Sequence, residues 1–262
     1  MRIAGRTVVV TGAGAGGGIG AALCRRFAAE GAAGIVVSDR VGQGAREIAA
    51  EVGGIAVEAD LAVPADVDRL VTSAIEQLGH VDLFCSNAGV RFGVGIGAAT
   101  ETWERTWQVN TLAHVLAARA VLPSMLERGE GYLLQTVSAA GLLTDMGDVA
   151  YSVTKHAALG LAEWLAVTYG DRGIRVSCLC PQGVRTEMLA AAGDPMLADG
   201  AIEPGDVAEA VVAGLADERF LILPHPLVAD YVRRRADDRD RWLGGMRRLR
   251  RSLPAAWLEP LG

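Results

Sequence analysis

Tyr151 and Lys155 lie four residues apart in a segment, residues 150–170, whose pattern predicts a helix. Residues at positions i and i+4 of a helix share one face, so the phenol and the ammonium group can share one site. A phenol has a pKa of about 10 and is a poor base at neutral pH, but a fixed neighbouring cation lowers that pKa. The pair therefore predicts a tyrosine that exchanges protons near pH 7. The structural alternative is a packed tyrosine beside a solvated lysine.

A glycine-rich segment joins the first predicted strand, residues 7–10, to the first predicted helix, residues 18–30. Glycines at such a turn let the backbone approach a pyrophosphate, which the N-terminus of the following helix attracts. The flexible surface turn is the alternative interpretation, because its composition is the same. The position between a strand and a helix favours a dinucleotide site.

Asp39 ends the second predicted strand, 19 residues after Gly20. A carboxylate there can accept hydrogen bonds from both hydroxyls of an adenine-side ribose, and it repels a 2′-phosphate. We therefore expect NAD as the cofactor, while Arg40, the next residue, leaves NADP open. Asp60 and Leu61 follow the third predicted strand and are expected at the same sheet edge, near the adenine.

The elements that must position these residues alternate along the chain. The predicted strands contain few polar residues, which indicates a parallel sheet covered by helices on both faces. With no linker or repeat, the sequence predicts one doubly wound α/β domain of the Rossmann type, with about seven strands, over residues 1–262. The predicted strands are residues 7–10, 35–38, 55–57, 81–84, 132–134, 174–179 and 220–223. The predicted helices are 18–30, 42–52, 64–78, 100–126 and 150–170, with another beginning at residue 204.

Composition excludes several functional classes. The net charge of −6 argues against a general nucleic-acid or membrane-surface role. Four cysteines form no Cys-x-x-Cys pair and no metal-ligand cluster with the four histidines, so we expect no metal site and reduced thiols in the cytoplasm. No uncharged apolar run reaches the length of a membrane helix.

Further motifs follow the glycine-rich segment in a fixed order. They are Ser86-Asn87-Ala88-Gly89, Asn110, Ser138-Ala139-Ala140-Gly141, Tyr151 with Lys155, and Pro181-Gln182-Gly183-Val184-Arg185-Thr186. Ser138 precedes Tyr151 by 13 residues. Each motif is common by chance, but their order and spacing together are specific. From residue 6 to about residue 223 the chain resembles the short-chain dehydrogenase/reductase family, in its short single-domain branch.

The resemblance implies roles for four catalytic residues. Tyr151 would be the acid/base, and Lys155 would lower its pKa and hold the nicotinamide ribose. Ser138 would donate a hydrogen bond to the substrate oxygen, where charge develops, and Asn110 would anchor a water that links Lys155 to solvent. The residues expected to contact the cofactor are Gly12, Gly14, Gly18, Ile19, Gly20, Asp39, Asp60, Leu61, Asn87, Ala88, Gly89, Tyr151, Lys155, Pro181, Gln182, Val184 and Thr186.

The sequence departs from the family pattern in three places. Five residues separate Thr11-Gly12 from Gly18-Ile19-Gly20, where the family usually has three, so the glycine that faces the phosphates stays open. Gln182 replaces a glycine beside the expected nicotinamide. Residues 224–262 form an Arg-rich, helical C-terminal extension in place of the usual ending.

The extension carries nine Arg and four Asp between Asp230 and Arg251, a local net charge of +5. Trp242, Met246 and Leu249 have the spacing of an amphipathic helix. We favour a solvated or subunit-packing helix. The alternative is a basic arm that covers a neighbouring subunit's site or recruits an acidic substrate tail such as a coenzyme A phosphate.

The expected function is an NAD-dependent oxidoreductase that interconverts a secondary alcohol and a ketone, with a small apolar substrate. The alternatives are an NADPH-dependent ketoreductase, including the 3-oxoacyl thioester type, and a non-catalytic dinucleotide-sensing regulator. The substrate is expected between residues 91–99, residues 141–149 and a lid at 187–202, whose Met188, Leu189, Met196 and Leu197 offer apolar surface.

Several residues outside the motifs receive a structural interpretation. His114 and His156 are expected to be structural, and Trp103 and Trp107 are expected to pack in the core. The resemblance also implies a homodimer or homotetramer that uses the helices at 100–126 and 150–170.

Overall fold

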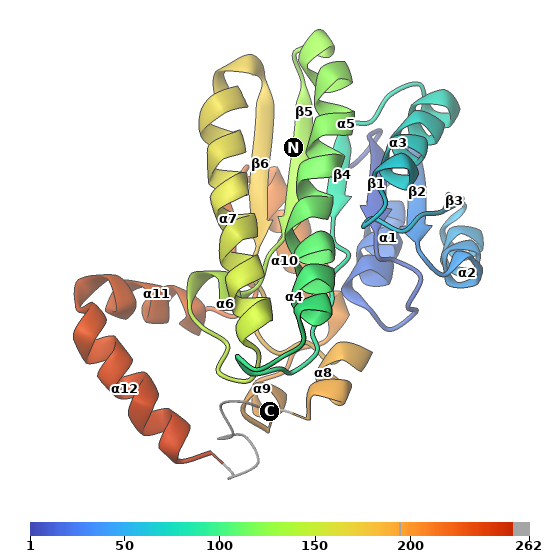
Figure 1. Ribbon diagram of the computed structural model, residues 1–262. Coiled ribbons are helices and arrows are strands. Elements are labelled where there is room, and N and C mark those ends of the chain that lie inside the picture. The colour runs from blue at the N-terminus through green and yellow to red at the C-terminus, as the bar shows by residue number, and fades with distance from the viewer. Residues whose placement is uncertain (194, 254–262) are drawn as a thin grey trace.

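Seven parallel strands form one sheet in the computed structural model, which describes residues 1–193 and 195–253 (Figure 1). The strand order is β3-β2-β1-β4-β5-β6-β7. The predicted doubly wound α/β fold of about seven strands is therefore confirmed. The strands are β1 Thr7–Thr11, β2 Gly34–Asp39, β3 Ile55–Glu58, β4 Leu83–Ser86, β5 Gly131–Thr136, β6 Ile174–Leu179 and β7 Leu221–Ile222.

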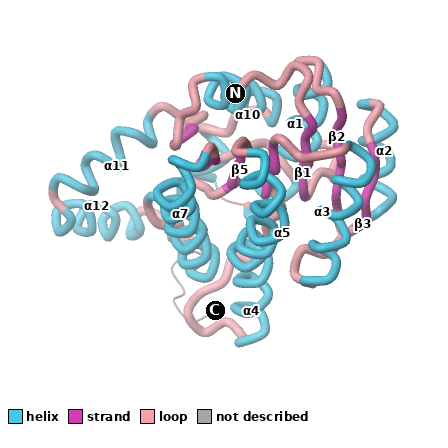
Figure 2. The backbone as a smooth tube through the Cα atoms, turned by 90° about the horizontal axis from the view of Figure 1, so that it is seen from above, coloured by secondary structure: helices cyan, strands magenta, loops and turns pink. Residues whose placement is uncertain are grey.

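Helices cover both faces of the sheet, as the view from above shows (Figure 2). One layer contains α3 Pro64–Leu78, α5 Ala113–Arg128 and α7 Val149–Tyr169, and the other contains α1 Ile19–Ala29, α2 Gly42–Val52 and α10 Pro204–Ala216. Successive strand residues point to opposite faces, so Val9 joins one hydrophobic cluster while Val8 and Val10 join the other. Burial on both faces explains why the strands read as nearly continuous apolar runs.

The predicted helix at 100–126 is not one continuous α-helix. It consists of α4 Thr100–Trp107, a π-helical turn η1 Gln108–Leu112, and α5. A π-turn accommodates one extra residue and often marks a functional site; this one contains Asn110. Residues 100–128 are long and apolar enough by composition to cross a membrane. Packing of α5 in the first cluster, through Leu116, Val121 and Met125, accounts for that composition here.

Short helices surround the carboxyl ends of the strands. They are α6 Ala139–Leu142, α8 Glu187–Ala192 and α9 Pro195–Asp199, and a 3₁₀ turn η2, Gly170–Arg172, follows α7 at the opposite end. The segment carrying α8 and α9 corresponds to the predicted lid. Gly183 permits its close approach, because a Cβ there would lie only 2.0 Å from the Leu197 carbonyl oxygen.

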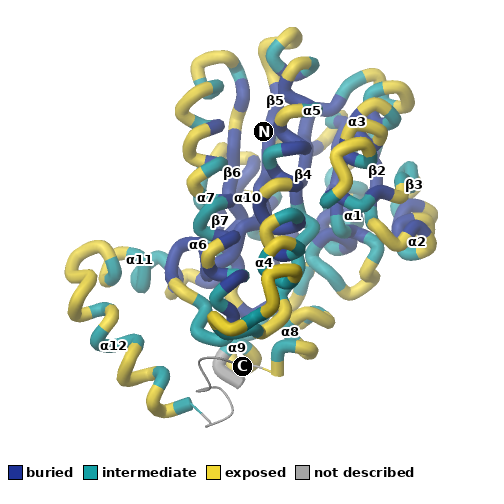
Figure 3. Tube along the Cα trace, viewed as in Figure 1, coloured by how far each residue is buried: buried dark blue, intermediate teal, exposed yellow. Residues whose placement is uncertain are grey.

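Two C-terminal helices, α11 Leu227–Asp237 and α12 Arg239–Arg251, project from the body (Figures 1 and 3). We call them the C-terminal arm. Val228 of α11 is fully buried, whereas α12 buries no residue completely. Asp238 caps α12 by accepting a hydrogen bond from the Arg241 backbone N–H at 2.9 Å. The predicted amphipathic helix around Trp242 is therefore present; residues 254–262 of the predicted extension lie outside the described residues.

Candidate active site

A cavity of about 1150 Å³ lies at the carboxyl edge of the sheet and spans the point between β1 and β4 where the strand order reverses. Most of the predicted site residues line this cavity, so the predicted cofactor-binding residues and the predicted catalytic residues share one space. Those lining it are Gly12, Gly18, Ile19, Asp39, Asp60, Leu61, Asn87, Ala88, Gly89, Ser138, Tyr151, Lys155, Pro181, Gln182, Val184 and Thr186. Gly14, Gly20 and Asn110 are absent from this lining and lie behind it.

The ends of the glycine loop pack too tightly for any side chain. A Cβ on Gly12, which has a φ of +64°, would lie 2.6 Å from the Ala88 Cα atom. A Cβ on Gly20 would lie 2.5 Å from the Gly12 carbonyl oxygen. Because of these approaches the N-terminus of α1 sits directly against the end of β1 and faces the cavity, where its exposed N–H groups favour an anion.

The two extra loop residues bulge away from the main cavity. Ala15 and Gly18 line that cavity, whereas Gly16 and Gly17 line a separate shallow depression. The Arg25 guanidinium donates to the Gly16 carbonyl oxygen at 2.8 Å and fixes the bulge. The longer loop therefore leaves the cradle beside β1 intact.

Asp39 is held in place by backbone donors. Its Oδ2 atom accepts from the Gly14 N–H at 2.9 Å and its Oδ1 atom accepts from the Val41 N–H at 3.0 Å. Gly14 has to be a glycine, because a Cβ there would lie 2.8 Å from the Asp39 side chain. Gly14 therefore orients the carboxylate from behind, and Asp39 itself faces the cavity.

The Asn87 side chain joins three strands by hydrogen bonds at the point where the strand order reverses. Its Nδ2 atom donates to the Thr11 and Gly12 carbonyl oxygens at 3.0 and 3.3 Å, and its Oδ1 atom accepts from the Thr136 hydroxyl at 3.2 Å. The ends of β1, β4 and β5 are thereby joined through one side chain that also borders the cavity.

Ser138, Tyr151 and Lys155, which we call the catalytic set, meet at the opposite end of the cavity. The Ser138 side chain lies close enough to the Tyr151 phenol to lower its pKa, and it accepts from the Ala140 N–H at 3.1 Å, capping α6. The Lys155 Nζ atom lies 5.6 Å from the centre of the Tyr151 ring and donates to the Thr136 carbonyl oxygen at 2.9 Å.

Burial dominates the acid–base properties of the catalytic set. It raises the pKa of Tyr151 to about 12, and the Ser138 side chain lowers it by a smaller amount. It lowers the pKa of Lys155 to about 8. The expected lowering of the Tyr151 pKa by Lys155 is not found: of the two groups that lower it, one is Ser138 and the other is Arg91. Because burial lowers the pKa of Lys155 to about 8, its amine has lost its proton before a phenol with a pKa of about 12 ionises, so it does not lower that pKa.

Asn110 lies behind Lys155 in the π-turn and is fully buried. Its side chain pairs with the Val90 backbone, accepting from the N–H and donating to the carbonyl, both at 2.8 Å. Both side chains border Gly89, since a Cβ there would make ordinary van der Waals contacts 3.4 Å from the Asn110 Oδ1 atom and 3.5 Å from the Lys155 Nζ atom. The structure thus places Asn110 next to Lys155, with its side chain occupied by the Val90 loop.

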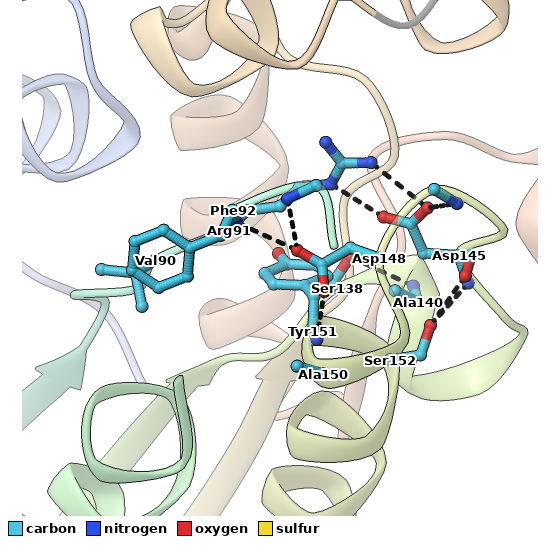
Figure 4. Close-up of polar contacts among 12 residues, drawn as sticks. Val90, Arg91, Phe92, Ser138, Ala140, Asp145, Asp148, Ala150, Tyr151 and Ser152 are labelled. Carbon is cyan, nitrogen blue, oxygen red and sulfur yellow. Dashed lines mark hydrogen bonds and ion pairs between the residues drawn. The ribbon is translucent and has the colours of Figure 1, made fainter. Parts of the chain in front are cut away.

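Asp148 is a site residue that the sequence analysis missed. It is 1% exposed and caps α7: its Oδ1 atom accepts from the Tyr151 N–H at 2.9 Å. Its Oδ2 atom accepts from the Phe92 and Gly93 N–H groups at 2.9 and 2.8 Å. Figure 4 shows these bonds around Tyr151. An Asp three residues before Tyr151 at the start of a helix is a capping signal that could have found it.

A buried ion pair, Arg91 with Asp145, adjoins this cap (Figure 4). The two contacts are 2.9 and 3.3 Å, and both residues line the cavity. Asp145 is tied to α7 in turn, because the Ser152 hydroxyl donates to its carbonyl oxygen at 3.1 Å. The partners are 54 residues apart, and no sequence pattern indicated the pair.

The predictions for the histidines agree with their contacts. His114 is buried against Gln135, and burial lowers its pKa to about 3, which makes it neutral at pH 7. His156 contacts the Ser152 carbonyl through Nδ1 at 2.8 Å. His225, which the sequence analysis did not consider, accepts from the Gln182 N–H at 3.1 Å and contacts the Gly183 carbonyl through its other nitrogen. It therefore fixes the backbone beneath Gln182.

The prediction of core packing for Trp107 is wrong: its exposed fraction is 44%. Trp103 and Trp107 both lie in α4, where Thr106 is the buried residue, so the spacing of the two indoles did not indicate a buried face. The predicted lid faces the cavity through Met188, Leu189 and Leu197, while the Met196 side chain lies outside the described residues.

Comparisons with known proteins agree with this geometry. The family model described as short chain dehydrogenase matches residues 6–196. A 1-deoxy-11-beta-hydroxypentalenate dehydrogenase of Streptomyces exfoliatus is 38% identical over 249 residues, covering 91% of this chain and 90% of its own length. The chain therefore belongs to the short-chain dehydrogenase/reductase family and is an oxidoreductase of that family.

Two solved structures are similar throughout. A short chain dehydrogenase/reductase from Burkholderia phymatum in complex with NAD has a TM-score of 0.83 and 28% identity, covering 92% of this chain and 96% of that one. A 7 alpha-hydroxysteroid dehydrogenase complexed with NADH and 7-oxo glycochenodeoxycholic acid has a TM-score of 0.78 and 26% identity, covering 85% and 93%.

Proposed function

We propose that this protein is an NAD-dependent dehydrogenase that interconverts a secondary alcohol and a ketone. The observation that carries the proposal is one cavity with Asp39 at one end and Ser138, Tyr151 and Lys155 together at the other. A dinucleotide bound in this cavity would be held by Asp39 at its adenine-side ribose and by Tyr151 and Lys155 at its nicotinamide end.

The residues of this chain fit a dinucleotide. Gly12 and the N-terminus of α1 form a cradle that a Cβ would fill, and such a cradle suits a pyrophosphate. Asp39 accepts the ribose hydroxyls, with Asp60 and Leu61 beside the adenine. Asn87 and Gly89 border the middle of the cavity, and Pro181, Gln182, Val184 and Thr186 border the nicotinamide end.

In the proposed mechanism the bound nicotinamide supplies the hydride acceptor in oxidation and the hydride donor in reduction. Tyr151 takes the hydroxyl proton of the alcohol, and in the reverse direction returns it to the developing alkoxide. Ser138 donates a hydrogen bond to the same oxygen, where charge develops. Lys155 holds the nicotinamide ribose from its position on the Thr136 carbonyl, and Asn110 keeps the Val90 loop against it.

The runner-up is an NADPH-dependent ketoreductase. Arg40 lines the cavity beside Asp39 and is the residue that favours this alternative. Asp39 opposes it, because its carboxylate points at the place where a 2′-phosphate would bind. Titrating NAD and NADP separately by protein fluorescence tests the choice. NAD is expected to bind at least about tenfold more tightly, and Asp39→Ser is expected to reduce that preference. Equal affinities would contradict the assignment.

We also propose an apolar substrate that enters between the lid and the loop before α7. Leu143, Met146, Met188 and Leu189 line this part of the cavity. The similarity to a hydroxypentalenate dehydrogenase and to a hydroxysteroid dehydrogenase supports a hydroxyl group on a bulky apolar skeleton. A screen for NAD reduction over terpenoid, steroid and 3-hydroxyacyl alcohols tests the proposal, with Tyr151→Phe as the control. Turnover that survives in that variant would contradict it.

The assembly proposed is a homodimer or homotetramer. An exposed apolar stripe on α7 contains Val153, Trp164 and Val167, and Trp107 and Leu112 are exposed on the neighbouring helix. Light scattering after size-exclusion chromatography tests the assembly, and a Trp164→Glu/Val167→Glu variant is expected to shift the mass towards the monomer.

We retain the cytoplasm as the proposed compartment, and one catalytic domain with a helical extension as the proposed organisation.

A further inference from the structure

The C-terminal arm forms one wall of the cavity. Arg241, Trp242, Gly245, Met246 and Arg248 of α12 line it, together with residues of α11. These positions follow helical spacing, so one face of α12 is turned to the cavity. Arg239 and Arg247 do not line it and lie elsewhere on the same helix. The arm therefore presents both apolar and cationic side chains to whatever occupies this end.

The cationic side chains on this wall are Arg234, Arg241 and Arg248. All three are exposed, and no ion pair to any of them occurs within residues 1–193 and 195–253. Asp237 and Asp238 are the acidic groups that the arm contributes to the wall. Asp238 is engaged in capping α12. Three guanidinium groups thus face the cavity with one uncommitted carboxylate among them.

Three other cations around the cavity are engaged, while Arg40 lies at the Asp39 end. Arg91 is paired with Asp145, Arg105 lies 3.2 Å from an Asp60 oxygen, and the Lys155 ammonium donates to a carbonyl. The arm is also strongly basic in a chain whose net charge is −6. A basic surface on this wall of the cavity creates a local field that attracts anions. Guanidinium groups suit carboxylate and phosphate oxygens, which they can bind in a bidentate manner.

We propose that Arg234, Arg241 and Arg248 bind an anionic group at the far end of an apolar substrate whose hydroxyl lies at Tyr151. The inference rests on the proposed function and names the substrate class: an amphipathic acid, with Trp242 and Met246 against its apolar body. Two similar proteins support this class. One is a hydroxypentalenate dehydrogenase and the other is complexed with 7-oxo glycochenodeoxycholic acid, and both compounds carry a carboxylate. A carboxylate and the phosphates of an acyl-coenzyme A share this chemistry, and the experiment separates them.

The test measures binding to the full-length chain in saturating NAD by calorimetry. The probes are chenodeoxycholate, its uncharged methyl ester and octanoyl-coenzyme A. Three proteins are compared: the wild type, Arg241→Gln/Arg248→Gln, and Arg239→Gln/Arg247→Gln. The two double variants carry the same net charge on the same helix, so they differ only in whether the lost guanidinium groups face the cavity.

The wild type is expected to bind an anionic probe roughly tenfold more tightly than the ester, since two exposed charge pairs contribute up to about 1 kcal/mol each. Arg241→Gln/Arg248→Gln should remove that preference and leave ester binding unchanged, whereas Arg239→Gln/Arg247→Gln should keep it. Raising the salt concentration should weaken only the anionic probes. Preference for chenodeoxycholate identifies a carboxylate, and preference for octanoyl-coenzyme A identifies a phosphate.

Equal affinity of the wild type for all three probes would overturn the inference, and so would an equal loss in both double variants. Turnover is measured separately, which keeps this result distinct from the proposed function. Selective anion binding without NAD reduction by any alcohol would count against the proposed function alone. NAD reduction by neutral alcohols without anion preference would count against the inference alone.

Discussion

The catalytic set and the C-terminal arm face each other across the same cavity and are held in opposite ways. Lys155 is 2% exposed and hydrogen-bonded, and Tyr151 sits on a helix whose first turn is capped by the buried Asp148. On the arm, α12 buries no residue completely, and Trp242 packs on Tyr231 with ring centres 6.2 Å apart. One region is fixed by burial and by hydrogen bonds, while the other rests mainly on side-chain packing.

This difference separates the reaction from its specificity. A proton transfer needs donor and acceptor within hydrogen-bond reach, so its residues need a rigid support. Recognition of the rest of a substrate tolerates a looser wall and relies on shape and charge. The predictions below test whether the two regions can be altered independently, beginning with the largest expected effect.

Tyr151→Phe removes the proposed proton carrier and is expected to lower kcat by about 10²- to 10⁴-fold. NAD affinity should stay nearly unchanged, because Asp39 and the glycine cradle are untouched. Initial rates of NAD reduction and a fluorescence titration with NAD measure the two quantities. Activity close to the wild type would remove Tyr151 from the chemistry.

Asp148→Ala should weaken the support of the catalytic set. It leaves three backbone N–H groups without their carboxylate acceptor, so we expect the unfolding free energy to fall by about 2–4 kcal/mol. Thr186→Ala, which removes the cap of the exposed helix α8, is the matched control with an expected loss of about 1 kcal/mol. Urea unfolding measures both. Similar losses would mean that the support at Tyr151 is no firmer than that of the lid.

Lys155→Met tests the burial of the ammonium group. Burial lowers the pKa of Lys155 from the ordinary 10.5 to about 8, so between these values the unfolded chain binds more protons than the folded chain. Folding therefore carries a full penalty below pH 8, and this penalty disappears as the pH rises to 10.5. The stability of the variant relative to the wild type should fall by about 2–3 kcal/mol from pH 7 to pH 10. A pH-independent difference, measured by urea unfolding, would show that folding does not lower the pKa of Lys155.

Deleting residues 239–262, which removes α12, should have the smallest effect on the fold. The deletion removes the packing of Trp242 on Tyr231 and no completely buried residue of α12, so we expect the melting temperature to fall by less than about 5 °C. NAD affinity should be retained. A large fall in melting temperature in a thermal scan would show that the arm supports the fold and is not held more loosely than the catalytic set.

The sequence was sufficient to predict the sheet and most of the proposed site residues that line the cavity, although Gly14, Gly20 and Asn110 do not line it. Strands that are buried on both faces appear in the sequence as apolar runs. The spacing of Ser138, Tyr151 and Lys155 predicted that the three side chains share one site, and all three line the cavity. The expected lowering of the Tyr151 pKa by Lys155 was not found. Helical spacing predicts that the two groups are close but not that they are buried, and burial lowers the pKa of Lys155 to about 8 while it raises that of Tyr151 to about 12.

Contacts between loops were beyond prediction. Arg91 and Asp145 meet only because two loops fold over the same end of the sheet, and neither residue lies in a periodic element. The π-turn around Asn110 was also missed, since one extra residue in a helix leaves no clear mark in an apolar pattern. The exposure of Trp107, at 44%, has a different origin, because Trp107 precedes the π-turn and lies in α4, where Thr106 is the buried residue.

The bulge at Gly16 and Gly17 offers a place to attach a probe. Neither glycine has a positive φ, and a Cβ at either position would meet no atom within 4 Å. All four native cysteines are buried, with thiol pKa values raised by burial, so they react poorly with alkylating reagents. A cysteine placed at position 17 would therefore be the preferred target for a fluorophore, a few residues from the nucleotide cradle but outside it. The extra length of this loop provides a labelling site for following cofactor exchange in real time.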